Sequence, residues 1–80
     1  MDSLSGFVEK IKYRNEENGY AILSVESGGE DYVLVGTFPM ISEGEYISAE
    51  GHFQLHPTYG EQLAVESYEI KTPEDSASVQ

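Results

Sequence analysis

Short runs of β-forming residues separated by turn residues fill most of this 80-residue chain, and this pattern restricts it to an all-β fold. The runs are rich in β-branched and aromatic side chains, whereas Gly, Asn and Pro gather between them. Residues 38–45 are less regular and have room for one helical turn around Met40 and Ile41. The predicted strands are residues 6–14, 20–26, 32–37, 46–55 and 62–71.

Five strands with short connections favour a small antiparallel barrel. The best match is an OB-fold, a five-stranded Greek-key barrel. Strand number alone leaves an SH3-like barrel as the alternative. We expect residues 1–71 to form this one domain, followed at 72–80 by a polar tail that links it to further domains. The candidate core residues are Val25, Val33, Val35, Ile47, Phe53 and Val65.

The strand predicted at 46–55 alternates most clearly and contains a glycine near its centre. Gly51 there indicates a bulge or a sharp bend of the kind that closes a barrel. The period of two residues places one set of side chains on the inner face of this strand. These residues are Ile47, Ala49, Gly51, Phe53 and Leu55.

Fifteen acidic residues oppose four basic ones, which gives a formal net charge of -11. Because nucleic-acid affinity depends largely on Lys and Arg neutralising phosphates, we expect at most weak autonomous binding to DNA or RNA. The balance favours a soluble protein or a basic partner surface. The chain has no cysteine and no apolar run of the roughly 18 residues that span a membrane, so we expect a cytoplasmic protein without a membrane partner.

The residue patterns that catalysis requires are missing from the sequence. No glycine loop ending in Lys-Ser or Lys-Thr is present to hold a phosphate. His52 and His56 lie four residues apart, roughly 13 Å along an extended strand, which is too far to share one metal ion. We therefore predict no enzymatic activity, no cofactor and no metal in this chain.

Three of the four basic residues lie close together in the first predicted strand. By the period-two rule, Lys10, Lys12 and Arg14 share one face. Ile11 and Tyr13 then lie on the other. OB-folds bind single strands through a basic groove and aromatic side chains on which bases stack, and the alternative is that the lysines only keep an exposed strand soluble. The candidate stacking residues are Tyr20, Tyr46 and Tyr59.

Three ordered stretches of the sequence carry a family signature. They are residues 6–11 (GFVEKI) running into 13–20 (YRNEENGY), then Val35-Gly36 followed by Gly44-Glu45 and Gly51, and finally residues 56–63 (HPTYGEQL). Together they resemble the N-terminal domain of RecD/TraA-type DNA helicases, specifically the stand-alone RecD-like proteins (exodeoxyribonuclease V α-subunit-like). Phe53 and Leu63 depart from that family, in which bulkier or aromatic residues are expected, but both keep the site apolar.

The resemblance implies an OB-type barrel at the front of a much larger ATP-dependent helicase of DNA repair or recombination. The motor of that family lies downstream, so no catalytic residue carries over, and ATP and magnesium are expected only in the motor domains. We expect a non-catalytic accessory domain that positions single-stranded DNA near the motor. The alternative is a docking module that contacts the motor or a repair partner without touching DNA. The downstream helicase domains are the expected partners, and the oligomeric state stays open.

Overall fold

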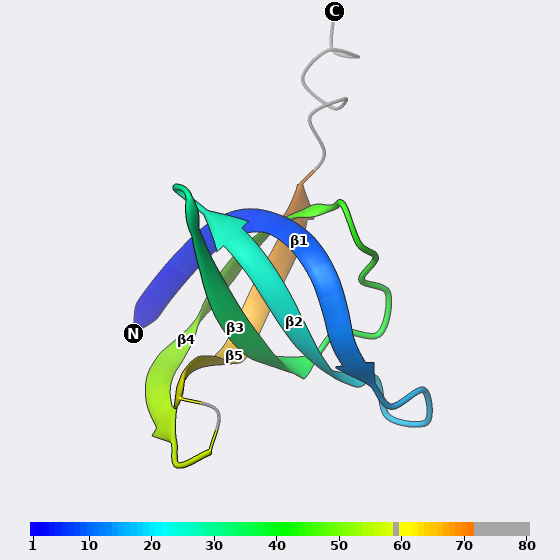
Figure 1. The fold of residues 1–80 in the computed structure, drawn as a ribbon. Helices are drawn as coiled ribbons and strands as arrows, with labels where there is room; N and C mark the ends of the chain where they lie inside the picture. Colours follow the sequence, from blue (N-terminus) through cyan, green and yellow to red (C-terminus); the bar gives the residue numbers. More distant parts are fainter. Residues whose placement is uncertain (59, 72–80) are drawn as a thin grey trace, which may run out of the picture.

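The long first strand organises the barrel. In the computed structural model, which describes residues 1–58 and 60–71, β1 (Asp2–Arg14) arcs across the molecule (Figure 1). The first half of β1 pairs antiparallel with β4 (Tyr46–His56), and its second half pairs with β2 (Tyr20–Ser27). This double pairing makes β1 common to both sides of the barrel.

The remaining strands complete a closed barrel in the order β1-β2-β3-β5-β4. β3 (Glu30–Thr37) pairs antiparallel with β2, and β5 (Gly60–Lys71) pairs antiparallel with β4. A short parallel contact between β3 and β5, at Leu34 with Leu63 and Val35 with Ala64, closes the ring. The predicted five-stranded barrel is confirmed.

The strand boundaries differ from the prediction mainly at the start of the chain. β1 begins at Asp2 rather than at residue 6, because the residues before Gly6 pair with β4. No helix occurs in the described residues, so the helical turn considered around Met40 and Ile41 is absent, and no helix there is long and apolar enough to cross a membrane. The predicted tail at 72–80 lies outside the described residues.

Two glycines allow neighbouring backbones to approach closely. A Cβ at Gly6 would lie 2.2 Å from the carbonyl oxygen of Glu26, at the point where β1 passes from β4 to β2. At Gly51 a Cβ would lie 1.9 Å from the carbonyl oxygen of Ala64. The β4–β5 register shifts beside Gly51, but the extra residue is Glu66 of β5, so the predicted irregularity occurs here with its bulge in the partner strand.

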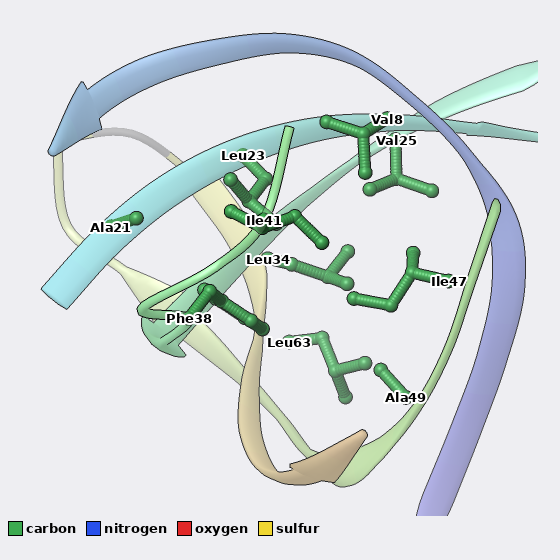
Figure 2. Close-up of a cluster of buried hydrophobic side chains, with 10 residues drawn as sticks. All are labelled: Val8, Ala21, Leu23, Val25, Leu34, Phe38, Ile41, Ile47, Ala49 and Leu63. Atoms are coloured by element: carbon green, nitrogen blue, oxygen red, sulfur yellow. The ribbon is translucent and has the colours of Figure 1, made fainter. Parts of the chain in front are cut away.

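The core receives side chains from every strand and from the connection between β3 and β4 (Figure 2). Phe38 and Ile41 of that connection are fully buried. The amide of Gly44 donates to the Val8 carbonyl at 2.7 Å, which fastens the connection to β1. The buried cluster comprises Val8, Ala21, Leu23, Val25, Leu34, Phe38, Ile41, Ile47, Ala49 and Leu63.

The structure confirms some of the predicted core residues and not others. Val25, Val35 and Ile47 are buried, as predicted. Phe53 and Val65 are only partly buried and pack against the edge of the core. The prediction for Val33 is wrong, because Val33 pairs with Ser24 on the outer side of the β2–β3 ladder and lines a groove there.

Leu55 was expected on the inner face of β4, but it is 80% exposed. The reason is that the β4–β5 hairpin continues past the last β1–β4 pair, which joins Asp2 to Gly51. Beyond that pair β1 no longer covers β4. The alternation of the sequence therefore continues after the barrel core has ended.

Candidate nucleic-acid interface

Two bulges in β1 change which of its side chains share a face. The aligned pairs between β1 and β2 are Val8 with Val25, Lys10 with Ser24, Ile11 with Leu23, Tyr13 with Ile22 and Arg14 with Ala21. Glu9 and Lys12 are the extra residues, and each one reverses the alternation that follows it. Ile11 and Arg14 therefore lie on the core side of the sheet, and Tyr13 lies on the outer side.

Arg14 is held within the fold. Its guanidinium Nη2 donates to the carbonyl oxygen of Ile41, and its Nε is buried with no partner among the described residues. The prediction that Arg14 shares one face with Lys10 and Lys12 is wrong, and the bulges are the physical reason.

The same bulges also separate Ile11 from Tyr13, which were expected to share a face. Ile11 packs against the core, whereas Tyr13 is 49% exposed. Tyr13 lies next to Tyr20, with ring centroids 6.4 Å apart and ring planes at 59°. Tyr20, which is 39% exposed, follows the β1–β2 turn, where its amide donates to Asn18 Oδ1 at 2.9 Å. The turn thus presents two exposed phenol rings side by side.

A groove of about 390 Å³ adjoins this tyrosine pair. It is lined by Lys12, Tyr13, Ile22, Val33 and Gln62. Lys10 lies on the same outer surface, since it pairs with Ser24, which in turn pairs with Val33. We call this surface the β2–β3 face, defined by Lys10, Lys12, Tyr13, Tyr20, Ile22, Val33 and Gln62.

The β2–β3 face combines side chains of the kinds through which OB-folds bind single nucleic-acid strands. Exposed tyrosine rings offer surfaces for base stacking, and lysine ammonium groups attract phosphates. The apolar side chains of Ile22 and Val33 provide a surface for sugars and bases. Of the predicted site residues, Lys10, Lys12 and Tyr20 come together here.

The other two candidate tyrosines do not join this face. Tyr46 pairs with Phe7 in the β1–β4 ladder, with ring centroids 4.9 Å apart and an edge-to-face angle of 74°. Phe7, the partner of Tyr46, lies in the first half of β1. Tyr13, the partner of Tyr20, lies in its second half. Tyr59 lies outside the described residues.

Tyr13, Ile22 and Gln62 line this face but are not among the site residues predicted from the sequence. A signal was present in the first strand, because the apolar residues Val8 and Ile11 are three positions apart. Two inward-facing residues at that spacing require an extra residue between them.

Carboxylates lie at the opposite end of the β1–β2–β3 sheet. A hydrogen bond with Asp31 raises the pKa of Glu9 above its ordinary value of 4.5, and desolvation and the charges of Asp31 and Glu26 raise it further. This acidic end repels phosphates. Residues 1–58 and 60–71 contain no group of three or more His, Asp or Glu side chains placed to hold a metal ion.

A closed five-stranded barrel with this strand order defines an OB-fold domain. Residues 1–73 match the family described as ATP-dependent DNA helicase YrrC, OB-fold domain, and the chain belongs to this family. No curated protein and no solved structure matches it.

The family match decides several of the predictions. The OB-fold is confirmed over the SH3-like barrel, and so is the relation to the OB domain of a DNA helicase. An OB-fold domain is a non-catalytic module distinct from a helicase motor, which agrees with the prediction that this chain is not itself an enzyme. OB domains commonly bind nucleic acid, so membership in a helicase family indicates an accessory nucleic-acid-binding role.

Proposed function

We propose that this domain positions single-stranded DNA near the motor of a RecD-like helicase that acts in repair or recombination in the cytoplasm. The observation that carries the proposal is the exposed Tyr13–Tyr20 pair beside a groove that Lys12 lines. ATP and magnesium act in the motor, and the chain described here contributes DNA contacts only.

The net charge of -11 makes the binding weak when the domain is tested alone. Such affinity suits an accessory surface, because the motor supplies the main hold on the strand. Lysine–phosphate contacts release counterions, so the affinity is expected to fall as the salt concentration rises.

Fluorescence anisotropy of a labelled oligothymidylate, titrated with the domain at low and then moderate salt, tests the proposal. Lys12→Glu is expected to weaken binding roughly five- to ten-fold. Lys71→Glu is the matched control, because it makes the same change in net charge at an exposed position opposite Tyr46. Equal losses in both variants, or no binding by the unaltered domain at low salt, would contradict the proposal.

The second candidate function is docking onto the helicase motor without DNA contact. The excess of acidic residues favours it, since an acidic surface steers a domain toward a basic partner. Salt-sensitive capture of the purified motor by this domain, together with no anisotropy change on DNA, is the result that would select it.

A further inference from the structure

A second outer surface lies on the other side of the shared first strand. The register places three rows of outward-facing residues across β1, β4 and β5. We call this the β4–β5 face. Its rows are Phe7, Tyr46 and Lys71; Ser5, Ser48 and Glu69; and Ser3, Glu50 and Ser67.

These rows face away from the core, because the alternating residues Ile47 and Ala49 of β4 are fully buried. No helix in the described residues covers this sheet. The rows therefore form an uncovered face of the barrel.

An aromatic pair occupies one end of the β4–β5 face. Phe7 and Tyr46 meet edge to face, and Phe7 is 44% exposed although it is fully apolar. The exposed ring offers a partner an apolar surface with the negative face of its π system.

A groove runs beside the aromatic pair. It has a volume of about 280 Å³ and is lined by Ser48, Glu50, Ser67, Tyr68 and Glu69. Among the described residues, neither Glu50 nor Glu69 forms an ion pair with a basic side chain, and Lys71 is the face's one basic residue. The groove is therefore a strip of serine hydroxyls between two unpaired carboxylates.

We propose that the β4–β5 face docks a basic protein segment that contains arginine. The planar guanidinium group stacks on exposed aromatic rings and forms paired hydrogen bonds with carboxylates, and this face offers both within one surface. Charge complementarity fixes the class of partner, because the same carboxylates repel a nucleic-acid backbone. The inference deepens the docking alternative and does not depend on DNA binding at the β2–β3 face.

The test uses a fluorescein-labelled Arg-Gly repeat peptide and its Lys-Gly counterpart, titrated with the domain at low salt. Glu50→Gln with Glu69→Gln is expected to weaken binding of the Arg-Gly peptide about ten-fold. The control is Glu16→Gln with Glu17→Gln, which makes the same change in net charge in the β1–β2 turn and is expected to change the affinity less than about two-fold. All four glutamates are exposed, so both double variants are expected to stay folded.

A second variant separates ring stacking from charge. Phe7→Leu keeps the site apolar but removes one of its two rings, so it is expected to reduce the preference for the Arg-Gly over the Lys-Gly peptide. If the two glutamate double variants weaken binding equally, net charge alone explains the attraction and the proposal is overturned. Failure of the Arg-Gly peptide to bind the unaltered domain, or an unchanged preference in the Phe7 variant, would also overturn it.

Discussion

The β2–β3 face and the β4–β5 face share one strand but present opposite chemistry. The second half of β1 brings Lys10, Lys12 and Tyr13 to one face, whereas its first half brings Phe7 to a face bordered by Glu50 and Glu69. A net charge of -11 therefore describes neither face well. We infer that the distribution of charge over the barrel, rather than its sum, determines which kind of partner each face can attract.

Gly6 is the residue of β1 at which the strand passes from the β4–β5 face to the β2–β3 face. Gly6→Ala is expected to have the largest effect, because its Cβ would lie 2.2 Å from the carbonyl oxygen of Glu26, where neither backbone can give way easily. Overpacking against backbone at such a site is expected to cost about 3 kcal/mol, the upper end of the usual range and a large part of the stability of a small domain. Thermal unfolding followed by circular dichroism measures this cost. Ser5→Ala, on the adjacent outward position, is the control, and equal melting temperatures for both variants would show that β1 does not need a glycine to pass between the faces.

The tyrosine pair tests which of the two faces binds DNA. Tyr13→Ala with Tyr20→Ala is expected to cost about 1–3 kcal/mol of DNA affinity for each base that loses its stacking partner. Phe7→Ala with Tyr46→Ala removes the aromatic pair of the other face and is expected to leave DNA affinity within about two-fold. Anisotropy titrations with the same oligothymidylate compare the two double variants. If the Phe7–Tyr46 variant loses as much affinity as the Tyr13–Tyr20 variant, the assignment of the strand to one face is wrong.

Arg14 tests whether the basic residues of β1 have different roles. Arg14→Gln is expected to lower the free energy of unfolding by about 1–3 kcal/mol, because the guanidinium hydrogen bond to the Ile41 carbonyl is lost at a half-buried site. DNA affinity at fixed salt is expected to change little, in contrast with Lys12→Glu. Urea denaturation and anisotropy on the same preparation separate the two effects. A large loss of DNA affinity with unchanged stability would show that Arg14 belongs to the DNA-binding surface.

The smallest effect concerns the acidic end of the β1–β2–β3 sheet. The pKa of Glu9 is raised by the hydrogen bond with Asp31 and by the nearby negative charges, so the folded state holds this proton more tightly than the unfolded state. Ionised Glu9 therefore destabilises the fold at neutral pH, and this penalty disappears as the pH falls through the raised pKa toward 4.5. Glu9→Gln is expected to raise the melting temperature slightly at pH 7 and to lose that advantage near pH 4.5. If the gain in melting temperature does not depend on pH, the titration of Glu9 is not its cause.

The sequence predicted the barrel well because each strand is marked by its own turn residues. The turn at 15–19 is an example, since Gly19 has a φ of +78° and Asn15 and Asn18 accept hydrogen bonds from the backbone amides of Glu17 and Tyr20. Such local chemistry can be read from the chain directly.

The site was harder to predict because it depends on pairing between strands. The bulges at Glu9 and Lys12 exist only relative to β2, and they moved Arg14 inward and Tyr13 outward. Leu55 shows the same limit, because its exposure depends on where β1 stops covering β4. Phe38 and Ile41 reach the core from a segment without regular structure, so no periodicity marks them.

The most direct test of the central claim is a titration of the ¹⁵N-labelled domain with an oligothymidylate, followed by amide chemical shifts at low salt. We expect the shifts to concentrate on Lys12, Tyr13, Tyr20, Ile22 and Val33, and the amides of Tyr46, Ser48, Glu50 and Glu69 to stay unmoved. Shifts that concentrate on the β4–β5 face, or that spread evenly over the barrel, would contradict it.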